Sequence, residues 1–168
     1  PWQRRIFSQQ RWLSQIISQK HLRSVLEVGC GFGRNLKYLS SRYPRAKFMG
    51  VDISRFLLRH AKTPHSIALF EAAAQKLPFK TNTFDLVFTH GTLMHLKAPQ
   101  VNLALKEMIR VSRKWLVIIE ETRSQPQSIN YFTFAHNYQA IIDAYHLKVI
   151  NFKSDHRHLV WYLCQKPT

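Results

Sequence analysis

The chain has 168 residues, a length that suits one domain built around one hydrophobic core. Hydrophobic residues make up 45% of it, and no apolar run approaches the roughly 20 residues of a membrane helix, so no membrane span is expected. Lys and Arg number 25 against nine Asp and Glu, a net charge of +16 that attracts polyanions such as RNA. A generally basic surface without a specific polyanion site is an equally good interpretation.

The two cysteines, Cys30 and Cys164, lie far apart in the sequence. They form neither a disulfide framework nor a metal-ligand cluster, and we expect no metal site and a reduced, cytoplasmic setting. Nothing in the sequence fixes the oligomeric state, and a monomer or weak homodimer is expected.

Predicted strands and helices alternate along the chain, which is typical of an α/β fold. Residues 1–23 predict an amphipathic helix, because the apolar side chains Ile6, Leu13, Ile16 and Ile17 share one helical face. Strands are predicted at 25–29, 47–51, 66–70, 85–89, 115–119, 147–152 and 159–164, and further helices at 35–43, 54–60, 100–112 and 135–145. Between the third and fourth strands there is room for a turn at most, around 72–76.

The connection between the last two strands is too short for a parallel crossover, so these strands are antiparallel. Together the elements predict a Rossmann-like, seven-stranded, mostly parallel sheet with an antiparallel last strand and helices on both faces.

A glycine-rich loop follows the first predicted strand, in the stretch Glu27-Val28-Gly29-Cys30-Gly31-Phe32-Gly33. Glycines allow a sharp turn and close approach of the backbone to a ligand, and the helix that follows presents free N–H groups. Asp52 ends the second strand, where a carboxylate can accept hydrogen bonds from both hydroxyls of a ribose. Glu27 is an acid in an apolar strand, which is costly without a partner. The alternative, a tight structural turn beside a surface aspartate, explains less of this pattern.

The loop spacing is G-x-G-x-G, which differs from the G-x-G-x-x-G of dinucleotide enzymes. The stretches VLEVGCGFGRNL (25–36), MGVDIS (49–54), AAAQKLPF (72–79), FDLVFTHGTLMHL (84–96) and the helix-strand unit ending in WLVIIEE follow in order. In these motifs the chain resembles the class I S-adenosylmethionine (SAM)-dependent methyltransferases, of the kind called methyltransferase type 11, over residues 25–166. The HGTLMHL, IIEE and VWYLCQK segments are similar to small methylases associated with pseudaminic acid biosynthesis.

The resemblance implies SAM as cofactor and one domain over residues 1–168, with the N-terminal helix at 1–23 and the catalytic core at 25–166. It implies that Glu27 and the loop hold the amino-acid part of SAM, that Asp52 holds the ribose and that Ile53 packs on the adenine. The implied cofactor-binding residues are Glu27, Gly29, Cys30, Gly31, Gly33, Asp52, Ile53, Ala73, Ala74 and His90. Many relatives carry Asp where this chain has Ala73, so one contact to the adenine is absent here.

Two histidines after the fourth strand, His90 and His95, are candidate general bases, or else polar histidines of the surroundings. Glu120 and Glu121 end the fifth strand and either bind the acceptor or solvate the strand end. The aromatic residues Tyr131, Phe132 and Phe134 either wall an acceptor pocket or cover the core.

The sequence predicts methyl transfer to a small-molecule acceptor, such as a sugar or another metabolite. His90-Gly91-Thr92-Leu93 stands where amino-methylating nucleic-acid enzymes carry [D/N]-P-P-[Y/F], which argues against DNA amino methylation. An RNA methyltransferase that uses the basic surface and a non-catalytic SAM-binding protein or partner subunit remain the alternatives.

Overall fold

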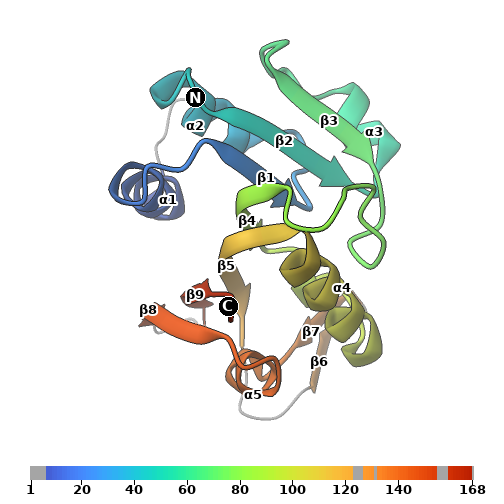
Figure 1. Cartoon of the computed structure of the whole chain (residues 1–168). Coiled ribbons are helices and arrows are strands. Elements are labelled where there is room, and N and C mark those ends of the chain that lie inside the picture. The colour runs from blue at the N-terminus through green and yellow to red at the C-terminus, as the bar shows by residue number, and fades with distance from the viewer. Residues whose placement is uncertain (1–6, 123–126, 131, 155–158, 168) are drawn as a thin grey trace.

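A computed structural model describes residues 7–122, 127–130, 132–154 and 159–167 (Figure 1). Its main sheet has seven strands in the order β3-β2-β1-β4-β5-β9-β8. The strands are β1 (Ser24–Val28), β2 (Lys47–Asp52), β3 (Ile67–Glu71), β4 (Phe84–His90), β5 (Ser112–Glu121), β8 (Lys148–Ser154) and β9 (Leu159–Gln165). The helices are α1 (Ser8–Gln19), α2 (Arg34–Arg42), α3 (Arg55–Arg59), α4 (Ala98–Val111), α5 (Tyr138–Ala144) and the 3-10 helix η2 (Leu93–His95).

Only β9 runs against the rest of the sheet: the neighbouring pairs from β3 to β5 are parallel, and β9 is antiparallel to both β5 and β8. The predicted Rossmann-like sheet with its antiparallel last strand is confirmed. After β1 the chain moves outward to β2 and β3 and then returns to the other side of β1 as β4. The carboxyl ends of β1 and β4 therefore flank the switch point where open α/β sheets bind ligands.

Helices cover both faces of the sheet, as predicted. On one face α1 and α2 bury Leu13, Ile16, Ile17 and Leu36 against β1, β4 and β5. On the other face α4 and α5 pack against the opposite side chains of the same strands. The helix expected within residues 1–23 occupies Ser8–Gln19, and Ile6 lies outside the described residues.

One region differs from the sequence prediction. The segment expected to be irregular contains a small hairpin, β6 (Gln127–Asn130) and β7 (Thr133–Ala135), outside the main sheet. The helix expected from Ala135 begins instead at Tyr138, because the Asn137 side chain accepts a hydrogen bond from the Ala140 N–H and caps the helix there. Ala135 and His136 are both buried beside this start.

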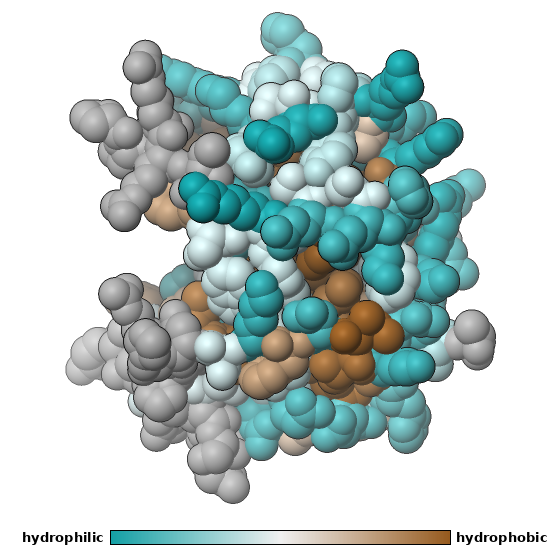
Figure 2. Space-filling view, turned by 90° about the vertical axis from the view of Figure 1, so that its left-hand side faces the viewer, coloured by the Kyte–Doolittle hydropathy of each residue, from teal (hydrophilic) through white to brown (hydrophobic). Residues whose placement is uncertain are grey.

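The molecular surface is polar in most places, and Figure 2 shows hydrophilic side chains over the upper half of one face. Apolar side chains gather in its lower half, at the level where Figure 1 places β8. This strand forms the sheet edge and exposes Ile150 and Phe152. Among the described residues, no helix is long and apolar enough to cross a membrane.

Candidate active site

The glycine loop is fixed to the end of the neighbouring strand. The backbone N–H groups of Gly29 and Cys30 both donate to the Val51 carbonyl oxygen, at 2.8 and 2.9 Å. Gly29 has φ +74°, and a Cβ built on it would lie 2.1 Å from the Thr92 Oγ1. Only glycine fits here, because any side chain would be strained and would collide with the segment after β4. At Gly31 the same added Cβ would meet nothing closer than 3.9 Å.

Asp52 connects the loop to β2. Its carboxylate accepts hydrogen bonds from the backbone N–H of Gly31 and of Ser54, each at 2.8 Å. A carboxylate offers about four lone-pair positions, so acceptor capacity remains for a ligand hydroxyl. Ile53, the next residue, leaves 74% of its apolar side chain exposed beside this carboxylate.

Glu27 lies under the loop with only 2% of its surface exposed. The Asn35 side-chain amide donates to Glu27 Oε1 at 2.7 Å. Glu27 Oε2 and Asn35 Oδ1 are buried and have no hydrogen-bond partner among the described residues. Burial raises the pKa of Glu27 to about 8, against the smaller opposing effects of the Asn35 hydrogen bond and the Arg34 charge. Two buried acceptors without a donor indicate a ligand that donates hydrogen bonds at this point.

Arg34 stands close to both Glu27 and His90, because its charge acts on both groups. Burial and, to a smaller extent, the positive charge of Arg34 lower the pKa of His90 to about 4. The Arg34 guanidinium lies over the Phe7 ring, 4.6 Å from its centroid, and the side chain is exposed. His90 is therefore neutral near pH 7 and a weak base.

His95 is held differently. It is exposed on η2, and its Nδ1 lies 2.7 Å from the Phe132 carbonyl oxygen. Because a carbonyl oxygen can only accept, Nδ1 carries the proton of this bond, and Nε2 bears the lone pair in the neutral ring. The side chain of Phe132 is 78% exposed. Phe132 is therefore not part of the core, Phe134 is half-buried, and Tyr131 lies outside the described residues.

Glu120 holds the backbone segment between His90 and His95 in place. It is fully buried and accepts hydrogen bonds from the Thr89 hydroxyl and from the backbone N–H groups of Thr92, Leu93 and Met94, at 2.9 to 3.2 Å. Burial raises its pKa, and these donors oppose that shift. Its carboxylate is thus used inside the protein to orient η2, while Glu121 is half-buried at the strand end.

The turn after β3 borders the site from the other side. The Ala72 N–H donates to the Asp52 carbonyl oxygen at 3.1 Å, which places the half-buried Ala73 and Ala74 next to Asp52. Further along, Glu107 accepts from the Leu77 N–H at 2.8 Å. Arg110 donates to the Phe79 carbonyl at 2.8 Å, so α4 holds this segment.

The predicted site residues thus come from neighbouring strand ends: the loop 29–33 and Glu27 from β1, Asp52 and Ile53 from β2, 73–74 after β3 and His90 from β4. His95 follows on η2. Arg34, Asn35 and Thr92 are not among the site residues that the sequence predicts. The first two stand at the start of the helix after the glycine loop, a position that could have drawn attention to them; Thr92 carried no such signal.

The arrangement suits a nucleoside cofactor with a cationic amino acid, since the unpartnered Glu27 oxygen, the glycine loop, the Asp52 carboxylate and the exposed Ile53 fit its parts. The model of the methyltransferase domain family matches residues 25–114 of the chain. The chain belongs to this family, the class I SAM-dependent methyltransferases, whose cofactor is SAM.

The chain is also similar to curated methyltransferases in sequence and to a solved methyltransferase structure in fold. The chain is 34% identical over 93 residues to a malonyl-[acyl-carrier protein] O-methyltransferase of Legionella pneumophila, covering 53% of this chain and 32% of the relative. It is 36% identical over 92 residues to a fatty-acid O-methyltransferase of Mycolicibacterium smegmatis, covering 53% and 33%. The chain thus spans about a third of the length of these curated relatives. The structure of magnesium protoporphyrin IX methyltransferase from Synechocystis PCC 6803 superposes with a TM-score of 0.76 at 12% identity, covering 95% of this chain and 82% of that one, which shows a shared fold.

Proposed function

We propose that the protein transfers a methyl group from SAM to an oxygen atom of a small-molecule acceptor. The observation that carries the cofactor half of this proposal is the buried, unpartnered Glu27 Oε2 beneath the glycine loop. A buried carboxylate with one oxygen left without a donor is costly, and a bound ammonium group offsets that cost. When bound, SAM supplies a methyl group on a sulfonium centre, which is already activated for transfer.

Each residue around the loop contacts a different part of the cofactor. Glu27 accepts from the ammonium group, Gly29, Cys30, Gly31 and Gly33 line the backbone cradle, and Asp52 accepts from the ribose hydroxyls. Ile53 covers one face of the adenine, and Ala73 and Ala74 border its edge. The exposed Arg34 guanidinium, near Glu27 and His90, is suited to a carboxylate.

His95 is the better candidate for a general base. The Phe132 carbonyl fixes Nδ1 as the donor, so Nε2 would be the atom that accepts the proton of an acceptor hydroxyl. His90, with a pKa of about 4, holds a proton poorly and serves better as an uncharged wall of the cofactor site. The different surroundings of the two histidines support this division of roles.

The acceptor class rests on two supports. The exposed Phe132 ring beside His95 offers apolar contact area for a substrate. The names of the two relatives describe O-methylation of malonyl-[acyl-carrier protein] and of a fatty acid. An acceptor with an oxygen nucleophile and an apolar body is consistent with both.

Calorimetric titration with SAM tests the cofactor assignment. Asp52→Ala should weaken binding by about 1.5–3 kcal/mol, because charged hydrogen bonds are lost. Glu71→Gln is the matched control: Glu71 is the register partner of Asp52 at the end of β3, but it pairs with Arg55 on the surface. Equal affinity in the Asp52 variant and the wild type would overturn the assignment.

An acceptor screen with labelled SAM tests the transfer step. With an active acceptor, His95→Gln should lower kcat by about 10²–10⁴-fold with little change in SAM affinity. His90→Gln should lower kcat much less. Tight SAM binding with no turnover on any acceptor would instead point to a SAM-binding protein without catalysis.

A further inference from the structure

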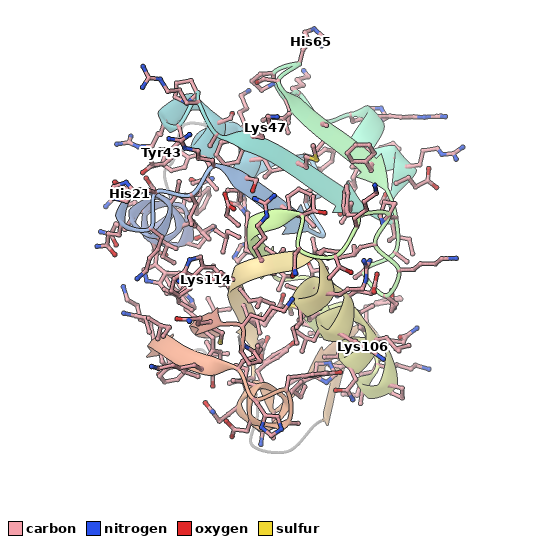
Figure 3. The ribbon with its side chains drawn as sticks, in the orientation of Figure 1. His21, Tyr43, Lys47, His65, Lys106 and Lys114 are labelled. Atoms are coloured by element: carbon pink, nitrogen blue, oxygen red, sulfur yellow. The ribbon has the colours of Figure 1, made fainter. Side chains whose placement is uncertain are left out.

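A row of cations lies at the end of the sheet where the parallel strands begin, which is opposite the cofactor site; we call this end the amino edge. The strands begin there, except for β9, which ends there. The seven residues of this amino-edge row are Lys20, Arg23, Lys47, Arg113, Lys114, Lys148 and Lys166. All are fully or partly exposed. In Figure 3, Lys47 and Lys114 project from the beginnings of β2 and β5, while Lys106 lies apart on α4.

Backbone pairing fixes the order of these cations in space. The Lys47 N–H donates to the Arg23 carbonyl at 2.7 Å, so these two residues lie side by side. The Lys166 N–H donates to the Lys114 carbonyl at 2.8 Å. Lys148 pairs with Gln165 across the β8–β9 ladder, next to Lys166. The row therefore crosses six adjacent strands, from β2 to β8. At about 4.8 Å per strand it is roughly 24 Å long.

An aromatic side chain holds two of the cations in place. The Nζ atoms of Lys20 and Lys114 lie 4.7 and 5.2 Å from the centroid of the Trp115 ring. Contacts of this kind between an ammonium group and an indole ring are attractive. Lys20 from α1 is thereby brought beside the start of β5 and joins the row.

Carboxylates are almost absent from this edge. Asp85 is the one acid among the residues that begin these strands, and it is already bonded by the backbone N–H groups of Arg23 and Ser24 and by Arg113, at 2.9 to 3.0 Å. No other member of the row has a salt bridge to a described residue. The Lys166 Nζ donates to the Asn82 Oδ1 at 2.7 Å and to the Ser112 carbonyl oxygen at 3.1 Å. The other five charges are thus available to a partner.

We propose that the amino-edge row binds the phosphate backbone of RNA, as a surface separate from the methyl-transfer site. A line of charges roughly 24 Å long can face about seven phosphates at the axial spacing of one nucleic-acid strand. Binding to a membrane surface adds apolar anchors to basic charge. The residues of the row offer none, since Trp115 is only 8% exposed, and the exposed Ile150 and Phe152 lie further along β8. Because the row and the cofactor loop lie at opposite edges, RNA held here is a docking partner and not the methyl acceptor.

The test is fluorescence anisotropy with a labelled, mixed-sequence single-stranded RNA over a series of salt concentrations. The double variant Lys47→Glu, Lys114→Glu should bind at least about tenfold more weakly, and its log–log salt slope should fall by about 1.4, or 0.7 for each lost phosphate contact. The control Lys37→Glu, Lys106→Glu makes the same change in net charge on α2 and α4, and should lose much less.

Equal losses in the two double variants would overturn the proposal, since the effect would then be one of net charge. Absence of RNA binding by the wild type would also overturn it, as would binding to phosphatidylserine vesicles in preference to RNA. A SAM titration of both variants should match the wild type. Failure of the wild type to bind SAM would reject the proposed function and leave the RNA result standing, so the two are distinguishable.

Discussion

Charged residues differ between the carboxyl ends of the strands (the carboxyl edge) and their amino ends (the amino edge). Five of the nine acids stand at or near the carboxyl ends of the strands: Glu27, Asp52, Glu71, Glu120 and Glu121. Glu27 and Glu120 are buried there, and Glu120 and Asp52 hold backbone N–H groups of the loops. At the amino edge, Asp85 bonds Arg113 and lies in a row of seven cations, of which five are exposed and two, Lys20 and Lys166, are half-buried. Buried carboxyl groups at one edge shape a small site, whereas the surface proposed for RNA at the other edge consists of exposed charges.

The difference has a physical cause. A buried carboxylate is stable only with donors around it, so each one dictates the local backbone. An exposed lysine is solvated and contributes little to the fold. Substitutions at the carboxyl edge should therefore change stability and cofactor binding together, while substitutions at the amino edge should leave stability nearly unchanged.

The largest effect is expected at Gly29. Gly29→Ala combines a strained φ with a Cβ 2.1 Å from the Thr92 Oγ1, and should lower the free energy of unfolding by about 3–5 kcal/mol. Gly31→Ala shares the positive φ but meets open space, and should cost about 1–2 kcal/mol. Urea denaturation of both variants measures the difference, and equal costs would show that Thr92 does not confine the loop.

The second-largest loss in the free energy of unfolding is expected for Glu120→Gln. The amide NH₂ replaces one acceptor oxygen among the backbone donors of Thr92, Leu93 and Met94, which should cost about 2–4 kcal/mol in thermal or urea unfolding. Glu121→Gln, at the half-buried neighbouring position, should cost less. A larger loss at Glu121 would contradict the role given to Glu120.

Glu27 should couple cofactor binding to pH. Its pKa is about 8 in the free protein, and ionisation is favoured by a bound ammonium, so SAM binding should release a proton. Affinity should then rise with pH between 6 and 7.5, by up to about tenfold per unit. Calorimetry in buffers of different ionisation enthalpy counts the released proton. Glu27→Gln should abolish both the release and the pH dependence.

The same raised pKa predicts a gain in stability for that variant. A carboxyl whose pKa is higher in the folded than in the unfolded state destabilises the fold increasingly as pH rises from about 4.3 to 8. Glu27→Gln should therefore raise the Tm of the cofactor-free protein at pH 8 by several degrees, as about 1 kcal/mol shifts Tm by about 2–4 °C. A lower Tm at pH 8 would show that the ionised Glu27 is satisfied within the protein.

The smallest effect is expected at the amino edge. Arg113 bonds Asp85 at 3.0 Å with its side chain 55% exposed, so Arg113→Gln should change the free energy of unfolding by about 0.2–1 kcal/mol. The loss should shrink further in high salt. A cost above about 2 kcal/mol would mean that this edge, like the other, is part of the structural framework.

Several features of the fold could be predicted from the sequence because they depend on neighbouring residues. The strand-helix rhythm, the G-x-G-x-G loop and the acid ending β2 follow from turn geometry and burial that neighbouring residues impose. Ser54 was predictable as the cap of α3, and it accepts from the Leu57 N–H. The small hairpin β6–β7 was missed, because short strands outside the sheet carry little periodic signal.

The sequence by itself determined the order of elements, the sheet type and the position of the cofactor loop, since hydrophobic period and glycine placement are local properties. Tertiary structure alone gave the two histidines different surroundings, because burial and the Arg34 charge act on His90 while the Phe132 carbonyl holds His95. It also brought the Glu120 carboxylate to the backbone N–H groups at the start of η2, and it brought cations that are scattered in the sequence into the amino-edge row. These outcomes depend on distances between residues far apart in the chain, which periodicity does not encode.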